Sequence, residues 1–322
     1  MKAVRITHTG APEVMKLVEL DKPQPGPGEA LIKVKAAGVN YIDVYYREGR
    51  YRADLPLTLG IEGAGVIEAL GDGMNHFHAG DRVAWCMYLG AYADYAIVPE
   101  KHLVPIPDGL GFEEAAGALL QGMTAHYLSR STYALKAGET ALVHAAAGGV
   151  GLLLTQMAAQ LGVRVIATVS TEAKAELARN AGAQDIIRYD EDDFETEVKR
   201  LTQNRGVDVV YDSVGKTTFG KSLRCLRPRG LMVLYGGSSG SVPAIEPVEL
   251  SLHGSIYLTR PSLAHYTLTP EELAWRSGEV YSAILQGTLK LHLEHRYPLS
   301  DVVLAHQELE GRKTTGKLVL TL

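Results

Sequence analysis

Residues 141–162 read ALVHAAAGGVGLLLTQMAAQLG, and this stretch decides the fold. An apolar strand pattern leads into the loop AAGGVG (146–151), and an apolar helix pattern follows it. Gly148 and Gly149 let the backbone approach a pyrophosphate, Gly151 lets the helix pack on the strand, and the helix N-terminus offers N–H groups. The pattern predicts a dinucleotide site with Gly148, Gly149 and Val150 as cofactor contacts.

Outward from this loop, the chain alternates apolar strands with helices from about 122 to 259, which is typical of a doubly wound parallel sheet. The expected strands are 141–147, 164–170, 185–190, 207–214, 231–236 and 255–259. The expected helices between most of them are 152–162, 172–182, 194–203 and 221–230. We therefore predict a nucleotide-binding domain over 122–259.

The flanking segments have a different pattern. Residues 1–121 consist of short β runs broken by Gly and Pro, which indicates a compact antiparallel domain. Residues 260–322 contain a helix pattern at 270–287 and two short β runs at 297–299 and 317–322. We expect this last segment to rejoin 1–121, so that an α/β nucleotide domain is inserted into a β-rich domain.

Composition narrows the possible partners and the location. The 32 Lys and Arg residues against 37 Asp and Glu residues give a net charge of −5, which does not favour nucleic acid or anionic lipid. No apolar run is long enough to span a bilayer, and MKAVRITHTG alternates like a strand rather than a signal peptide. The only cysteines, Cys86 and Cys225, are expected to be free and buried. We expect a cytoplasmic protein.

The type of dinucleotide is indicated by the end of the second predicted strand. NAD sites usually carry an acid there, but the first acid is Glu172, inside the next helix. Lys174 follows within one turn, where an ammonium group suits a 2′-phosphate, and Ser170 and Tyr189 lie at the ends of neighbouring strands. This favours NADP(H). Helix capping by Ser170, a solvated face for Lys174 and a plain strand-end aromatic at Tyr189 are the alternatives.

The chain resembles the quinone oxidoreductase/ζ-crystallin branch of the medium-chain dehydrogenase/reductase superfamily, and within it the bacterial NADPH:quinone reductases. The resemblance rests on motifs along nearly the whole chain: AAGVNYIDVYYREGRY (36–51), LGIEGAGVI (59–67), AGDRVAW (79–85), GAYADYAIVP (90–99), LLQGMTAHYL (119–128), VVYDSVG (209–215), RPRGLMVLYGGSSG (227–240) and TTGKLVL (314–320). It implies a GroES-like, β-rich catalytic domain and a Rossmann NADP(H) domain.

This resemblance also raises the question of zinc. The first-ligand position of the zinc enzymes, a Cys there, is Asn40 here, and the second, a His there, is Ile61. Glu62 remains, but one carboxylate does not hold zinc, which needs about three protein ligands. We therefore predict no metal. Without a Lewis acid, a quinone is a better acceptor than a simple carbonyl, because it is already electron-poor.

The resemblance implies an acceptor site in a cleft between the domains, with 36–51 as one wall. Asn40 would offer amide hydrogen bonds to the nicotinamide or the quinone oxygen, Asp43 would orient the segment, and Tyr45 and Tyr51 would line the pocket. A turn role for Asn40, a helix cap at Asp43 and simple packing of the tyrosines are the alternatives.

Two other tyrosines of this segment, Tyr41 and Tyr46, are expected to point away from the pocket. Thr124 and Tyr127 are expected at the first turn of a helix that links the domains, as cofactor contacts implied by the resemblance. The remaining contacts expected from it follow two strands of the nucleotide domain, where a generic Gly/Ser turn is the alternative: Ser213, Tyr235, Gly236, Ser238 and Ser239.

Three functions remain open at this point. The first is NADPH:quinone reduction, and the second is reduction of an enal, enone or enoyl C=C bond, which needs the same hydride. The third is a structural or RNA-binding role like that of some ζ-crystallin relatives, which the acidic balance disfavours. Because 255–259 is the expected edge strand, and the superfamily often pairs there, we also expect a homodimer.

Overall fold

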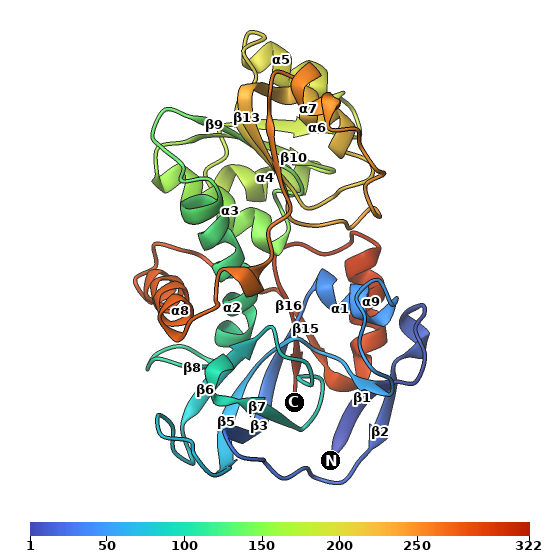
Figure 1. Ribbon diagram of the computed structural model, residues 1–322, viewed down its shortest axis with the longest axis vertical. Coiled ribbons are helices and arrows are strands. Elements are labelled where there is room, and N and C mark those ends of the chain that lie inside the picture. The colour runs from blue at the N-terminus through green and yellow to red at the C-terminus, as the bar shows by residue number, and fades with distance from the viewer. The chain divides into compact units, whose positions relative to one another are not determined.

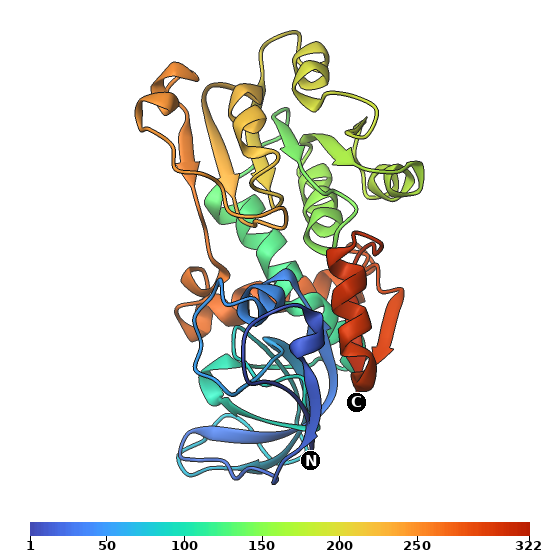
Figure 2. The ribbon, with the colours of Figure 1, turned by 90° about the vertical axis from the view of Figure 1, so that its right-hand side faces the viewer.

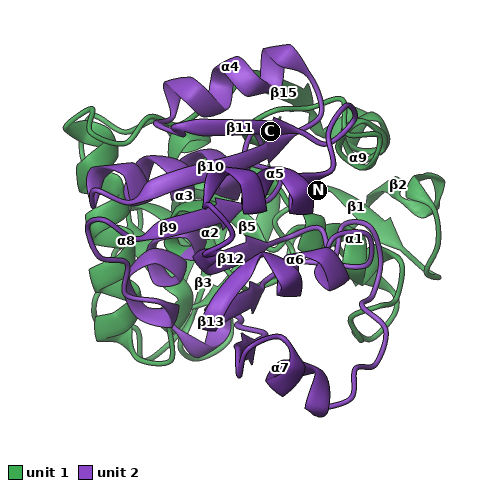
Figure 3. Ribbon diagram, turned by 90° about the horizontal axis from the view of Figure 1, so that it is seen from above, with its two compact units in different colours: residues 1–123, 267–322 green, residues 124–266 purple.

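The computed structural model describes all residues, 1–322. The chain forms two compact units, coloured separately in Figure 3: unit 1 is Met1–Met123 with Thr267–Leu322, and unit 2 is Thr124–Tyr266. The prediction of a β-rich domain that carries an inserted doubly wound domain is confirmed. None of the helices is both long and apolar enough to cross a membrane.

Unit 1 contains two sheets (Figure 1). The larger has the order β15-β16-β3-β5-β6-β8, with β7 pairing on β3, and the smaller has the order β2-β1-β4. The strands are β1 Lys2–Ile6, β2 Lys16–Glu19, β3 Glu29–Val39, β4 Leu57–Thr58, β5 Glu62–Leu70, β6 Arg82–Cys86, β7 Tyr95–Pro99, β8 Leu103–Pro105, β15 His295–Pro298 and β16 Leu318–Thr321. Trp85 and Tyr92 are the largest aromatic side chains of their core.

The helices of unit 1 are α1 Tyr41–Arg47, α2 Phe112–Tyr127, which runs on into unit 2, α8 Pro270–Leu285 and α9 Val302–Glu310. Short 3-10 turns lie at Pro12–Val14, Glu100–His102 and Leu299–Asp301. Thr269 caps α8 by accepting the Glu272 N–H, and Pro270 occupies its first position, which a missing N–H suits. Helix α9 packs against β15, as the red segments of Figure 2 show. The sequence interpretation missed α9.

Unit 2 is one parallel sheet in the order β11-β10-β9-β12-β13-β14, which is the Rossmann strand order. Its strands are β9 Thr140–Val143, β10 Arg164–Val169, β11 Asp185–Arg188, β12 Val207–Asp212, β13 Leu226–Leu234 and β14 Tyr257–Thr259. Strands β9, β10 and β12, at the centre of the sheet, are buried almost throughout and mostly apolar, whereas β11, β13 and β14 include partly exposed residues. Strand β14 lies at the edge of the sheet, as predicted.

The helices of unit 2 are α3 Gly149–Gln160, α4 Glu172–Asn180, α5 Phe194–Leu201, α6 Phe219–Cys225 and α7 Val248–Leu252, with a wider π turn at Leu128–Thr132 and a 3-10 turn at Leu263–His265. The predicted helix over 221–230 is wrong in its second half, because α6 ends at Cys225 and β13 begins at Leu226. Pro228 cannot continue a helix, and Arg229 takes a left-handed φ of 61°.

Candidate active site

The segment that begins α1 is held by the Asp43 carboxylate. Asp43 Oδ2 accepts the backbone N–H of Asn40 (2.8 Å), and Oδ1 accepts the backbone N–H of Ile61 (3.0 Å). Asp43 therefore caps α1 and also joins the two positions where the zinc enzymes carry ligands. Burial raises the pKa of Asp43 to about 7, against the lowering effect of the Asn40 N–H, the Lys317 charge, the Tyr92 hydroxyl and the Ile61 N–H.

The side chain of Asn40 lies in a buried polar cluster. Its Nδ2 donates to Glu62 Oε2 (2.8 Å), and its Oδ1 accepts from Lys317 Nζ (2.8 Å) and Gln121 Nε2 (3.3 Å). Lys317 Nζ also donates to Glu62 Oε2 (2.6 Å), and the other oxygen of Glu62 accepts the N–H of Leu120 (2.6 Å). Both members of the Lys317–Glu62 pair are fully buried. The amide of Asn40 is thus engaged by protein groups.

A chain of hydrogen bonds connects Asp43 to helix α9. Arg47 Nη1 donates to His306 Nδ1 (3.0 Å), so the His306 proton lies on Nε2, which contacts the Tyr92 hydroxyl at 3.3 Å. Tyr92 in turn donates to Asp43 Oδ2 (3.1 Å). Burial lowers the pKa of His306 to about 3, so the ring is neutral, and Arg47 is balanced by Glu310 at 2.6 Å. The chain therefore directs donors toward the Asp43 carboxylate.

A cavity of about 540 Å³ in unit 1 has a mixed lining: the aromatic and apolar side chains of Tyr46, Tyr51, Leu55 and Leu57, and the polar or charged ones of Thr9, Arg52 and Asp54. The rings of Tyr46 and Tyr51 meet edge to face, with centroids 5.6 Å apart. Tyr46 lines this cavity because the chain folds back after α1 and brings Tyr51 against it. Tyr45 is buried and contacts Tyr51 (5.4 Å between centroids), but it does not line this cavity.

In unit 2, the glycine loop is shaped for close approach. A Cβ on Gly151 would lie 2.4 Å from the Ala145 carbonyl oxygen, so helix α3 packs on the loop only with glycine there. Gly148 is the N-cap of α3, and no side chain caps the helix. The first turn of α3, which includes Gly149 and Val150, can thus offer N–H groups to a phosphate. These residues fit a dinucleotide pyrophosphate.

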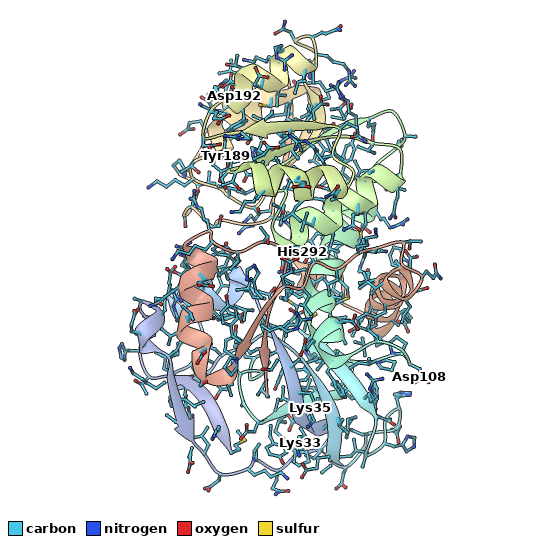
Figure 4. All side chains as sticks on the ribbon, turned by 180° about the vertical axis from the view of Figure 1, so that it is seen from behind. Lys33, Lys35, Asp108, Tyr189, Asp192 and His292 are labelled. Carbon is cyan, nitrogen blue, oxygen red and sulfur yellow. The ribbon has the colours of Figure 1, made fainter.

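The predicted 2′-phosphate residues lie at the ends of neighbouring strands. The Tyr189 N–H donates to the Val169 carbonyl oxygen (3.1 Å), which places Tyr189 beside Ser170; Tyr189 is 42% exposed and labelled in Figure 4. The Thr171 hydroxyl caps α4 by accepting the Lys174 N–H (3.3 Å). The residue that caps this helix is therefore Thr171, the neighbour of Ser170.

Glu172, the acid nearest to this strand end, is engaged by two arginines. Its carboxylate contacts Arg179 at 2.6 Å and Arg188 at 3.5 Å, and the bond to Arg179 is the main reason that the pKa of Glu172 is lowered. A carboxylate held in this way is a poor partner for a ribose 2′-hydroxyl. The surroundings therefore fit a cofactor that carries a 2′-phosphate.

The loops after β12 and β13 pack on each other. The Ser238 N–H donates to the Ser213 carbonyl oxygen (3.1 Å), and a Cβ on Gly236 would come within 2.5 Å of that same oxygen. The Tyr235 N–H donates to the Asp212 carbonyl oxygen (2.9 Å). The Ser239 hydroxyl is used within the protein, where it donates to Val214 O (2.7 Å) and accepts the Thr217 N–H. The predicted residues of these two loops are thus brought together at the carboxyl edge of the sheet.

Thr124 and Tyr127 lie elsewhere than expected. Helix α2 begins at Phe112, so both residues are in its last turn and the predicted position in a first turn is wrong. Both are buried, and the Tyr127 ring stacks on Tyr266 with a centroid separation of 4.3 Å. The Tyr127 ring therefore packs within unit 2.

Comparison with known proteins identifies the family. Residues 26–108 match the alcohol dehydrogenase GroES-like domain, and residues 149–271 match the zinc-binding dehydrogenase family. A quinone oxidoreductase of Pseudomonas aeruginosa is 45% identical over 99% of each chain. The chain belongs to the quinone oxidoreductases. It is one of the medium-chain dehydrogenase/reductase proteins, as its motifs indicated.

Two further members of this group bear on its chemistry. The crystal structure of the Escherichia coli quinone oxidoreductase, complexed with NADPH, covers 100% of each chain at 42% identity with a TM-score of 0.98. A 2-haloacrylate reductase of a Burkholderia species is 40% identical and covers 99% of this chain and 98% of its own. The NADP(H) prediction agrees with the first of these.

The zinc in the family description does not fit this quinone oxidoreductase. No three His, Cys, Asp or Glu side chains gather where they could hold a metal ion. Position 61 carries an alkyl group, the amide at position 40 is engaged by Lys317 and Glu62, and Glu62 faces an ammonium group. Sequence interpretation missed Lys317 and His306. The signal for Lys317 was a lone lysine at the start of the apolar run KLVL.

Proposed function

We propose that this chain reduces quinones with NADPH and without zinc. One observation carries the proposal. The chain keeps the full glycine loop of unit 2, but it has Asn40 and Ile61 at the two positions where zinc enzymes place ligands. Quinones accept a hydride without a Lewis acid, because their reduction restores aromaticity. Residues 122–259 form the cofactor domain in this proposal, and 1–121 with 260–322 form the catalytic domain.

In this proposal, residues of unit 2 bind the cofactor and residues of unit 1 bind the acceptor. Bound NADPH supplies the hydride. The first turn of α3 binds the pyrophosphate, and Lys174, Ser170 and Tyr189 bind the 2′-phosphate side of the cofactor. The loops after β12 and β13 border the nicotinamide ribose. Tyr46 and Tyr51 pack on a flat acceptor ring through their faces and edges.

The test is a set of NADPH-oxidation assays with benzoquinones, naphthoquinones and 2-haloacrylates side by side, each repeated after exhaustive chelation. We expect the quinones to be turned over fastest, with no loss after chelation. Faster oxidation of ethanol by NADP⁺ than reduction of any quinone by NADPH would contradict the proposal.

A second candidate function is reduction of an activated C=C bond. It is favoured by the 40% identity to the 2-haloacrylate reductase over nearly the whole chain. Such a reduction needs the same hydride and the same binding groups. The haloacrylate arm of the assay distinguishes it, because a kcat/KM above that of every quinone would make the C=C reductase the main activity.

Replacing Lys174 with glutamate is expected to raise the KM for NADPH by roughly 10- to 100-fold and to leave the KM for NADH nearly unchanged, because one charge-assisted phosphate contact is lost. Steady-state kinetics with both cofactors measures this. The matched control is Lys101→Glu, the same charge change at an exposed residue of unit 1. Equal effects of Lys174→Glu on both cofactors would remove Lys174 from the 2′-phosphate site.

A homodimer through β14 also belongs to the proposal. Tyr257 on this edge strand is 63% exposed, and Val248 and Leu252 of α7 are exposed at 58% and 72%. An unpaired edge with exposed apolar side chains favours pairing with a second copy. Sedimentation of Tyr257→Asp should show a monomer, whereas Leu268→Asp, at an exposed leucine of unit 1, should remain a dimer.

We further propose that the enzyme acts in the cytoplasm. The support is that Cys86 and Cys225 are both free and buried, as is usual in a reducing compartment. Fractionation of cells that express the chain from its own gene tests this location, and recovery from an oxidising compartment would contradict it.

A further inference from the structure

Four segments of unit 1 meet around the ammonium group of Lys317. Asn40 follows β3, Glu62 begins β5, Gln121 belongs to α2 and Lys317 precedes β16. Lys317 and Glu62 are 0% exposed, and Asn40 is 4% exposed. Burying a lysine and a glutamate carries a large desolvation cost, and only close pairing and full hydrogen bonding offset it. The fold therefore builds this cluster at a cost that simple packing would not require.

The backbone makes room for this ammonium with glycines. A Cβ on Gly38 would lie 2.2 Å from Glu62 Oε2 and 2.8 Å from Lys317 Nζ. A Cβ on Gly117 would lie 3.2 Å from Cγ of Lys317. The Lys317 side chain thus fits where it does because two residues on different elements, Gly38 and Gly117, have no side chain.

The contacts fix the amide of Asn40 in one orientation. Its oxygen faces two donors, Lys317 Nζ and Gln121 Nε2, and its nitrogen faces an acceptor, Glu62 Oε2. If the amide turned over, its NH₂ group would face the ammonium and its oxygen would face the carboxylate. Both contacts would then be repulsive, so the ion pair sets which end of the amide points where.

We propose that Lys317 is a positioning residue for the reaction, because its buried ammonium neutralises Glu62 and locks the amide of Asn40 at the position that holds a metal ligand in the zinc enzymes. The positive charge at this site is then the Lys317 ammonium group, whereas in the zinc enzymes it is a bound metal ion. The inference rests on the proposed function and on the role that the resemblance implies for Asn40, beside the nicotinamide or the quinone oxygen. A misplacement of such a group costs roughly 10- to 100-fold in rate.

The test compares Lys317→Met, Glu62→Gln and the double variant with the wild-type enzyme, by melting temperature, by NADPH affinity and by kcat and KM for a benzoquinone. Either single variant leaves one buried charge without its partner and is expected to melt at a lower temperature. The double variant leaves no lone charge and is expected to regain most of the melting temperature. Its kcat is expected to stay roughly 10- to 100-fold low, because the Asn40 amide is no longer locked, while NADPH affinity stays within about twofold.

The double variant separates positioning from stability. If kcat and the melting temperature both return to the wild-type values, the ion pair serves the fold alone and the proposal is wrong. A double variant that does not fold has the same meaning, because the pair would then be a structural requirement. Lys313→Met, an exposed lysine in the same segment, is the matched control. A wild-type enzyme that does not reduce quinones would overturn the proposed function instead, which keeps the two failures distinct.

Discussion

Replacing Gly38 with alanine is expected to lower the free energy of unfolding by about 3 to 5 kcal/mol, which is the usual cost of breaking a buried ion pair. The reason is steric. The new Cβ would lie 2.2 Å from Glu62 Oε2 and 2.8 Å from Lys317 Nζ, and neither group has room to withdraw in a fully buried cluster. In a domain of this size the melting temperature should fall by roughly 10 °C.

Differential scanning calorimetry measures the effect, and a second glycine of unit 1 gives the control. Gly278 lies on the exposed side of α8, where an added Cβ would meet nothing within 4 Å. Gly278→Ala is therefore expected to raise stability by about 0.5 to 1 kcal/mol, because alanine restricts the unfolded chain and favours the helix. If Gly38→Ala had the same melting temperature as the wild-type protein, the Lys317–Glu62 pair would have to move away from the new Cβ. That would contradict the close packing of the pair.

The nucleotide unit could be predicted from sequence because its signals are local. The loop at 146–151, the strand before it and the helix after it all lie within residues 141–162. Each has a recognisable sequence pattern: an apolar run for the buried strand, glycines for the tight loop and an apolar run for the helix. Two of the wrong predictions also concern local features. The helix predicted over 221–230 ignored Pro228. The start of α2 was placed too late, so that Thr124 fell in the wrong turn.

Unit 1 was harder to predict from the sequence because its contacts join distant parts of the chain. Lys317 and Asn40 are 277 positions apart, and His306 and Tyr92 are 214 apart. The spacing of residues along the sequence does not predict such long-range contacts. Helix α9, which carries His306, did leave a signal, since Val302, Ala305 and His306 are buried at helical spacing. The resemblance implied roles for Asn40 and Asp43, but it did not indicate that Lys317, Glu62 and Tyr92 would hydrogen-bond to their polar groups.

Ionisation of Asp43 is expected to weaken the fold of unit 1 as pH rises. Burial raises the pKa of this carboxyl from 3.8 to about 7, so the folded protein holds the proton more tightly than an unfolded chain does. Stability linked to a raised acid pKa is therefore greatest at low pH and falls as pH rises through the window from 3.8 to about 7. Between pH 5 and pH 8 the loss should be ~3 kcal/mol.

The measurement is the free energy of unfolding in urea at several pH values, for the wild-type protein and for Asp43→Asn. Asparagine does not titrate, but it presents an NH₂ group to at least one of the donors Ile61 N–H, Asn40 N–H and Tyr92 hydroxyl, so the variant is less stable at every pH. The stability advantage of the wild-type protein should shrink from pH 5 to pH 8. Asp193→Asn is the control, because the hydrogen bond from Lys221 lowers the pKa of Asp193 to about 2 and its titration ends below this window. A wild-type advantage that grew with pH would mean that the hydrogen bonds to Asp43 outweigh its burial, and that the carboxyl group is already ionised at pH 5.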